Sequence, residues 1–309
     1  MNKVKQNLQI GILVAVLSAG LAQAQQAAGP RIYREGGGWV EEITGSLPAA
    51  RNLRVKTDMG NVRVQGGAQG INFSFHMKVN AGSEESARRR LESFRVTASR
   101  QGDTAVIIGD CRGDCPRNAS AEFVLEVPSD TAQVKLETGG GNLSASSLNG
   151  SLAAETGGGN LRLDGLGGPA AASSGGGNVE VGSVRSNLAV STGGGNIHVG
   201  AAGGPLSIST GGGAVVVDTG KATVDVDTGG GGIHVTHVGG ALKVNTGGGN
   251  IEIGDVGGAV IAETGGGGIH LGWAKGMVRA ETGGAPWSSG AWPEACAPRP
   301  ALAMSPSSW

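Results

Sequence analysis

The sequence predicts an all-β fold, a parallel β-solenoid with two short strands in every 18-residue coil. Three observations lead to this class: a repeat of fixed length, an alternation of apolar and polar residues around it, and an abundance of glycine. Glycine accounts for 60 of the 309 residues and aromatic residues for only 3%, which is poor material for an ordinary globular core. Such a chain is either disordered or built from thin repeated layers, and the order of its residues favours the layers.

The repeat is centred on the tetrapeptide Thr-Gly-Gly-Gly, which recurs every 18 residues without an insertion. One copy has Ser in place of Thr, and the last has Ala285 in place of the final Gly. Regular recurrence of this kind indicates a repeat architecture. The copies begin at Thr138, Thr156, Ser174, Thr192, Thr210, Thr228, Thr246, Thr264 and Thr282.

Apolar residues occupy four columns around each tetrapeptide, two and four residues before the Thr and five and seven residues after it. The residues between them are mostly polar or small, such as Lys243 and His198. An alternation with period two specifies half-buried strands, and Gly-rich arcs turn the chain at little steric cost. Each coil therefore holds two strands, and the stacked coils form two facing parallel sheets around a slim aliphatic core.

Four segments divide the chain. Residues 1–24 are expected to be a secretory signal peptide, because Lys3 and Lys5 precede an apolar run and Ala22-Gln23-Ala24 fits the cleavage pattern. Residues 25–131 are expected to form an irregular N-terminal cap of the solenoid, with a worn repeat at 53–62 and one short helix over 84–94. Residues 132–284 form the regular solenoid, and we expect no transmembrane segment after the signal is removed.

Residues 285–309 form an irregular tail that is rich in Trp and Pro and contains Cys296. Three origins fit its sequence: a native cap, a disordered tail, or the frameshifted end of a longer solenoid.

Two stretches resemble a known family. Residues 123–130 read Phe-Val-Leu-Glu-Val-Pro-Ser-Asp, and residues 134–143 read Val-Lys-Leu-Glu-Thr-Gly-Gly-Gly-Asn-Leu. Together they resemble the bacterial "putative adhesin" domain family of unknown function, and the resemblance extends over about residues 53–284. It implies a secreted or envelope-associated β-solenoid. It implies adhesion by label alone and brings no catalytic residues.

Metal binding is disfavoured by the residues of the arcs. Calcium β-rolls, which have coils of similar length, carry Asp in their arcs, whereas residues 193–198 here read Gly-Gly-Gly-Asn-Ile-His. His198, His234 and His270 share one column but lie two coils apart, about 10 Å, too far to share one ion. A weak site that includes Glu252 and His237 is conceivable, but exposed polar side chains are the favoured interpretation. We therefore expect neither a metal nor a cofactor.

The Thr column has two interpretations, an ice-binding array of hydroxyls on a flat face or a set of hydrogen bonds to the arc backbone. A neighbouring Asn column is interrupted at Ala214, Gly232 and Gly268, which would break a binding lattice but not a turn. The backbone interpretation is therefore favoured. The Thr ladder consists of Thr138, Thr156, Thr192, Thr210, Thr228, Thr246 and Thr264.

Acidic residues precede the Thr in several copies. Ser or Asn replaces them in the other copies, and no pair of carboxylates is singled out for acid–base chemistry. A polysaccharide-active β-helix is thus a weak alternative, and we expect no enzyme. The acidic residues are Glu137, Glu155, Asp227, Glu263 and Glu281.

The most specific local motif runs from Cys111 to Cys115. In an exported chain, cysteines four residues apart can be bridged across a tight turn. Such a loop would present Arg112, Gly113 and Asp114 at its tip, as integrin ligands do, although a stapled hairpin turn is the favoured interpretation.

The net charge of −1 provides no basic face for nucleic acid. Two non-enzymatic functions fit: an exported adhesin-like solenoid that binds at the cell envelope, or a periplasmic structural or stress-related scaffold without an external ligand. The expected partners are a glycan, a surface or an envelope protein. The expected location is the periplasm, the outer cell surface or the medium.

Overall fold

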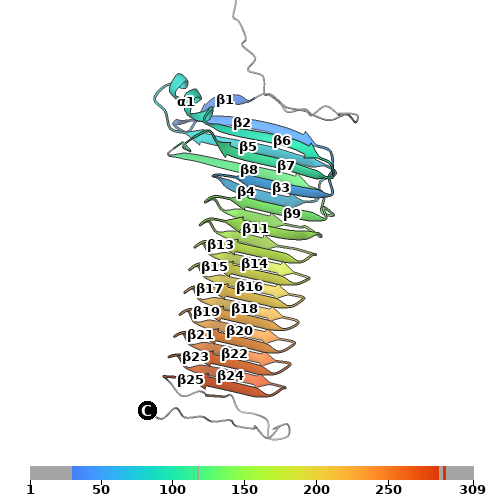
Figure 1. Ribbon diagram of the computed structural model, residues 1–309, viewed down its shortest axis with the longest axis vertical. Coiled ribbons are helices and arrows are strands. Elements are labelled where there is room, and N and C mark those ends of the chain that lie inside the picture. The colour runs from blue at the N-terminus through green and yellow to red at the C-terminus, as the bar shows by residue number, and fades with distance from the viewer. Residues whose placement is uncertain (1–29, 114, 117, 285–287, 290–309) are drawn as a thin grey trace, which may run out of the picture.

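The computed structural model describes residues 30–113, 115–116, 118–284 and 288–289, and over these residues the chain is a parallel β-solenoid (Figure 1). The predicted signal peptide, the end of the tail from residue 290 and Asp114 lie outside the described residues. Within the described part, the strands form one sheet of 12 strands and one of 14. The predicted fold class is confirmed, including the single short helix near the N-terminus.

Each regular coil contributes one strand to each sheet, and equivalent residues of successive coils pair in parallel register. Leu206, for example, pairs with Leu188 in the preceding coil and with Val224 in the next. In the 12-stranded sheet the strands of the regular coils are β9 (Gln133–Thr138), β11 (Ser151–Thr156), β13 (Ala170–Ser174), β15 (Leu188–Thr192), β17 (Leu206–Thr210), β19 (Val224–Thr228), β21 (Leu242–Thr246), β23 (Val260–Thr264) and β25 (Val278–Thr282).

The 14-stranded sheet receives the second strand of each coil. Most of these strands are six residues long, because they continue past the apolar pair to a further buried residue such as Val238 or Val256. They are β10 (Leu143–Ser146), β12 (Leu161–Asp164), β14 (Val179–Val184), β16 (Ile197–Ala202), β18 (Val215–Gly220), β20 (Ile233–Val238), β22 (Ile251–Val256), β24 (Ile269–Ala274) and β26 (Ser288–Ser289).

The arcs require glycine because the backbones of neighbouring coils approach each other closely. A Cβ atom on Gly195 would collide with the carbonyl oxygen of Gly177, one coil earlier. A Cβ atom on Gly194, in contrast, would meet no atom within 4 Å. The first and third glycines of the tetrapeptide are therefore fixed by stacking, and the middle one is not, except in the last copy, where a Cβ atom on Gly284 would approach the backbone of Gly266.

The N-terminal region adds antiparallel strands and closes that end of the solenoid. On the 14-stranded sheet, β1 (Arg31–Glu35), β2 (Gly38–Leu47), β5 (Ile71–Val79) and β8 (Ala119–Val127) pair in sequence as antiparallel neighbours. On the other sheet, β6 (Phe94–Gln101) and β7 (Thr104–Cys111) form an antiparallel hairpin at the edge. The helix α1 (Glu84–Leu91) follows β5.

One coil joins this cap to the regular solenoid. It consists of β3 (Asn52–Thr57) and β4 (Asn61–Gly66), the worn repeat predicted from the sequence. Thr57 pairs with Thr138, and Val62 pairs with Leu143, so this coil stacks on the first regular coil in full register. On its other side, β3 pairs with β7 and β4 pairs with β8.

Candidate functional site

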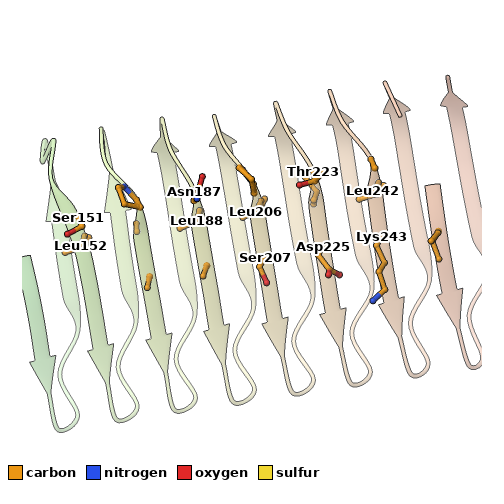
Figure 2. A pocket seen from close by; sticks show the side chains of 18 of the residues that line it. Ser151, Leu152, Asn187, Leu188, Leu206, Ser207, Thr223, Asp225, Leu242 and Lys243 are labelled. Carbon is orange, nitrogen blue, oxygen red and sulfur yellow. The ribbon is translucent and has the colours of Figure 1, made fainter. Parts of the chain in front are cut away.

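A shallow groove of about 710 Å³ lies on the outer surface of the 12-stranded sheet (Figure 2). It crosses the strands from β11 to β23, parallel to the long axis of the solenoid. The side chains that border it stand in two rows. The first row precedes the strands and consists of Pro169, Asn187, Pro205, Thr223, Ala241 and Ala259. The second row, called here the Ala189 row, takes the second residue of each strand and consists of Ala171, Ala189, Ser207, Asp225, Lys243 and Ile261.

The groove exists because the outward positions in the middle of the sheet carry small residues. The same position in other coils holds the longer side chains of Lys135 and Arg279, each of which bonds a glutamate on its own strand. Ala171, Ala189 and Ser207 leave the sheet surface bare, and these three residues are exposed. Contiguous exposed apolar surface with a polar border is typical of an interaction site.

Two charged side chains line the groove, and they lie side by side. Asp225 and Lys243 are paired residues on the adjacent strands β19 and β21. Both are exposed, and within the described residues neither forms an ion pair or a side-chain hydrogen bond. This arrangement offers contact surface with one acid and one base rather than a constellation for acid–base chemistry.

The outer face of the 14-stranded sheet is polar by comparison. Its ion pairs connect neighbouring coils: Arg162 Nη1 lies 2.9 Å from Glu180 Oε2, and His234 Nδ1 lies 3.1 Å from Glu252 Oε2. His198 Nε2 lies 3.1 Å from Asp218 Oδ2, and the His270 ring hydrogen-bonds to Ser288. The predicted His column is thus divided among separate partners. No group of three or more His, Cys, Asp or Glu residues in the described part of the chain could hold a metal ion.

The Thr column lies inside the arcs rather than on a surface. Thr210 Oγ1 donates a hydrogen bond to the carbonyl oxygen of Gly195 at 2.9 Å and accepts one from the Gly213 N–H at 3.2 Å. The same two bonds recur at Thr192 and Thr246, and Ser174 makes them with its hydroxyl. At most 6% of any Thr in the ladder from Thr138 to Thr264 is exposed, so this column does not provide the exposed hydroxyls that an ice-binding array needs.

The Asn column also bonds from coil to coil. The Oδ1 atom of Asn142 accepts the backbone N–H of Asn160 at 2.8 Å, and Asn160 does the same for Asn178. Asn196 accepts the N–H of Ala214, so the donor needs no Asn side chain of its own. This explains why Ala or Gly can interrupt the column.

The acidic residues that precede the Thr lie on the outer face of the 12-stranded sheet, beside the groove. Glu137 has the most partners: Lys135 Nζ at 2.6 Å and Arg54 Nη2 at 3.3 Å. The hydrogen bond from Lys135 is the main cause that lowers the pKa of Glu137, and Arg54 adds to it. Glu281 is bound by Arg279 at 2.7 Å, and none of the five acidic residues lines the groove.

The Cys111-to-Cys115 motif lies in the cap, away from the groove. The two cysteines form a disulfide with Cα atoms 5.1 Å apart. The loop is held by two backbone donors: the Cys111 N–H bonds to Asp58 Oδ2 at 2.9 Å, and the Arg112 N–H bonds to the Ser93 carbonyl at 2.7 Å. Gly113 follows with a φ of +89°, and Asp114, the residue on which an integrin-like contact depends, lies outside the described residues.

The groove itself was missed by the sequence analysis. The available signal was the run of Ala153, Ala171, Ala189 and Ser207 in an outward column that holds Lys or Arg in other coils. An unusually small residue in an exposed column exposes the sheet beneath it, although it carries no chemical motif.

No helix in the part of the chain that the structure describes is long and apolar enough to cross a membrane. No family model matches the chain, and no curated protein is similar to it in sequence.

Solved structures with a related fold include proteins described as adhesins. A "putative adhesin" from Parabacteroides distasonis is 14% identical, with a TM-score of 0.49 over 82% of this chain and 97% of its own. A "putative lipid binding protein" from the same species is 14% identical, with a TM-score of 0.44 over 80% and 96%. A "putative adhesin" from Bacteroides fragilis is 11% identical, with a TM-score of 0.37 over 82% and 97%. Structural neighbours of this β-solenoid thus bear the name of the family that the sequence resembles, and identities this low transfer no ligand or activity to the chain.

Proposed function

We propose that this protein is an exported, non-catalytic, adhesin-like module of the bacterial cell envelope, and that the groove on the 12-stranded sheet is its binding surface. The observation that carries the proposal is the groove itself. Its volume of about 710 Å³ falls in the range of ~300–1,000 Å³ that is typical of ligand sites. Its lining is apolar with a few polar side chains, which is the usual composition of such sites.

Export is supported by two features. Residues 1–24 have the pattern of a signal peptide, and the Cys111–Cys115 disulfide is of a kind that persists in oxidising compartments. The periplasm, the outer surface and the medium all meet this condition. The partners that fit such a location are a glycan, a surface or an envelope protein.

The alternative is a periplasmic structural or stress-related scaffold without an external ligand. The observation that favours it is the continuous core from β9 to β25, in which every coil is held by its neighbours and which would make a stiff spacer. Protease shaving of intact bacteria separates the two functions. Cleavage on unbroken cells supports the adhesin-like module, and protection until the outer membrane is opened supports the scaffold.

The binding surface is tested with purified protein and bacterial envelope fractions. Ala189→Arg fills the groove with a side chain that the fold accepts, since Arg279 occupies the equivalent position in another coil. Val216→Arg is the matched control on the opposite face, where Arg162 occupies the equivalent position. We expect Ala189→Arg to weaken envelope binding at least tenfold and Val216→Arg to leave it unchanged. Binding that survives Ala189→Arg but is lost in Asp114→Ala would move the site to the loop at 111–115.

A further inference from the structure

Asp225 and Lys243 carry opposite charges on adjacent strands of the groove, yet within the described residues neither forms an ion pair. Some charged residues of the same sheet are bonded, Lys135 and Arg54 to Glu137 and Arg279 to Glu281, whereas other acidic residues of this face have no ion pair in the described part of the chain. Figure 2 shows the Asp225 and Lys243 side chains on the same side of adjacent strands. An acid and a base at neighbouring positions of one exposed face are complementary to the same two residues on a second copy that is turned around.

We infer that the occupant of the groove face is a second copy of this chain, packed antiparallel through the outer surface of the 12-stranded sheet. The inference goes beyond the proposed function, because it names a second copy rather than an envelope ligand as the occupant of this face. The symmetry axis lies in the plane of the face, parallel to the strands and midway between β19 and β21. It reverses the long axis of the solenoid, so that β19 of one copy faces β21 of the other.

This axis gives two reciprocal ion pairs, since Asp225 of each copy faces Lys243 of its partner. The neighbouring strands also match. With β17 over β23, Ser207 faces Ile261 and Ser209 faces Glu263. With β15 over β25, Ala189 faces Arg279 and Ser191 faces Glu281. Asp227 faces Asn245, and no like charges meet among these facing residues.

The two neighbouring registers are less favourable. An axis centred on β19 would bring Asp225 against Asp225 and Asp227 against Asp227, and an axis centred on β21 would bring Lys243 against Lys243. Opposed like charges at an interface are strongly unfavourable. Packed sheets cross at about 30°, which displaces residues far from the axis most. Asp225 and Lys243 lie next to the axis, so their pairing is the least disturbed by this rotation.

The available area is sufficient for a modest dimer. Six strands from β15 to β25, spaced by ~4.8 Å and each ~17 Å long, cover about 490 Å² on each copy. The total of about 1,000 Å² is near the lower limit for a specific interface, and the small Ala189 and Ser207 leave room for the longer Arg279 and Ile261 side chains that face them. We therefore expect micromolar self-association. The two caps, each with its Cys111–Cys115 loop, would lie at opposite ends of the pair and would stay free for other contacts.

The test is a charge exchange between two separately purified variants, followed by sedimentation velocity. The wild-type chain should dimerise with increasing concentration, and Asp225→Lys and Lys243→Asp should each associate at least tenfold more weakly because like charges meet at the axis. An equimolar mixture of the two variants should restore the dimer as a heterodimer, in which each Lys faces an Asp. If Asp225 and Lys243 acted only within their own chain, mixing the two variants would not restore association. A wild-type chain that stays monomeric, or a mixture that does not associate, would overturn the inference.

Chemical cross-linking checks the register. In the proposed pair Ser207 faces Ile261 of the partner across two packed sheets, which lie about 10 Å apart, too far for a direct disulfide. Ser207→Cys/Ile261→Cys should therefore form a covalent dimer with a bifunctional thiol reagent that spans about 10 Å. Ser207→Cys alone should not, and the wild-type chain controls for Cys296. Absence of the cross-link in a chain that still dimerises would refute this register.

The outcomes separate this inference from the proposed function. A monomer whose envelope binding depends on Ala189 would refute the second copy and leave the function in place, and so would a monomer that carries a copurified aliphatic chain in the groove. If the wild-type chain is a dimer and neither Ala189→Arg nor Asp114→Ala changes envelope binding, the result would support the second copy and refute the proposed ligand surface.

Discussion

The cap and the regular coils solve the problem of building a core in different ways. The regular coils use aliphatic side chains in repeated columns, such as Ile208 and Val226, and bury no aromatic residue. The cap contains all four Phe residues of the chain, and three of their rings pack together: Phe75 lies 4.6 Å from Phe123 and 5.3 Å from Phe94 between ring centroids. The coils are stacked in parallel, whereas the cap is largely antiparallel.

This difference has a consequence for stability. Each regular coil contacts only its two neighbours, so a local defect should propagate little beyond them. In the cap, β8 pairs with both β4 and β5, and its Phe123 packs against the ring of Phe75, which also stacks on Phe94. The cap should therefore lose its structure as one cooperative unit, and it is this unit that closes the sheet edges at the N-terminal end.

The largest expected effect is that of Phe123→Ala. Removal of a fully buried Phe costs about 3–5 kcal/mol, so the free energy of unfolding of the cap should fall by that amount. Hydrogen exchange should show lost protection in β5 to β8, with β15 to β21 unchanged. Phe123→Leu, which keeps most of the apolar volume, should cost less than half as much. Equal loss of protection along the whole solenoid would refute the division into a cooperative cap and locally coupled coils.

A smaller effect is expected for glycine in a regular arc. Gly195→Ala places a methyl group against the Gly177 carbonyl, and because that neighbour is backbone we expect a cost of about 3 kcal/mol, near the upper end for overpacking. Gly194→Ala is the matched control and should be neutral or stabilising by up to ~1 kcal/mol, because its Cβ meets nothing and the unfolded chain loses entropy. Urea unfolding of the two variants measures the difference. Equal destabilisation by both would show that intrinsic flexibility, not stacking, selects glycine in the arcs.

The same comparison explains what the sequence could predict. In the coils, every pairing is local and is repeated, so the period, the strands and the two facing sheets could be read from columns such as Leu188, Leu206 and Val224. In the cap, Val62 pairs with Phe123 and Phe75 pairs with the same residue from the other side. No repeat relates these distant positions, and only the worn coil at 53–62, the short helix and the presence of strands were predictable. The helix ends at Leu91, three residues before the predicted boundary, because Glu92 caps it.

The candidate site was less accessible than the fold. The motifs that stand out in the sequence are polar, such as the Thr ladder and the Cys111-to-Cys115 loop. The groove arises from small side chains at exposed positions, and its character depends on which strands lie next to one another. Asp225 and Lys243 are 18 residues apart in the chain, so the predicted repeat already places them side by side, but no motif marks the two residues as a site.

The Thr ladder provides a prediction of intermediate size. Thr210→Val keeps the shape of the side chain but removes the hydroxyl, which donates a hydrogen bond to the Gly195 carbonyl and accepts one from the Gly213 N–H. Unsatisfied buried backbone groups cost about 1–3 kcal/mol, so we expect a loss of about 2 kcal/mol in urea unfolding. Thr210→Ser should cost well under half of this, since Ser174 makes the same bonds in its own coil. If Val and Ser were equally tolerated, the hydroxyl would have no stabilising role.

The smallest expected effect concerns Glu41 in the cap, and it depends on pH. The alternation of β2 places Glu41 on the apolar side of the strand, where Ile32 and Met77 are its cross-strand neighbours. Burial, with a smaller contribution from the Glu92 carboxylate, raises the pKa of Glu41 to about 7. Because the folded state holds this proton more tightly than the unfolded state, the contribution of Glu41 is complete below the ordinary pKa of 4.5 and is lost as the pH rises through 7.

We therefore expect Glu41→Gln to stabilise the cap by about 1–2 kcal/mol at pH 8 and to have little effect at pH 4.5, as measured by urea unfolding at both values. The gain should be confined to the cap, because β2 contacts none of the regular coils in the strand order of its sheet. Glu42→Gln is the neighbouring control: Glu42 lies on the other side of the strand, where it is bound by His76 Nε2 at 3.2 Å. If the Glu41 variant were more stable by the same amount at both pH values, the result would contradict a buried titrating carboxylate. The gain would then come from the packing or hydrogen bonding of the Gln side chain, which does not depend on protonation.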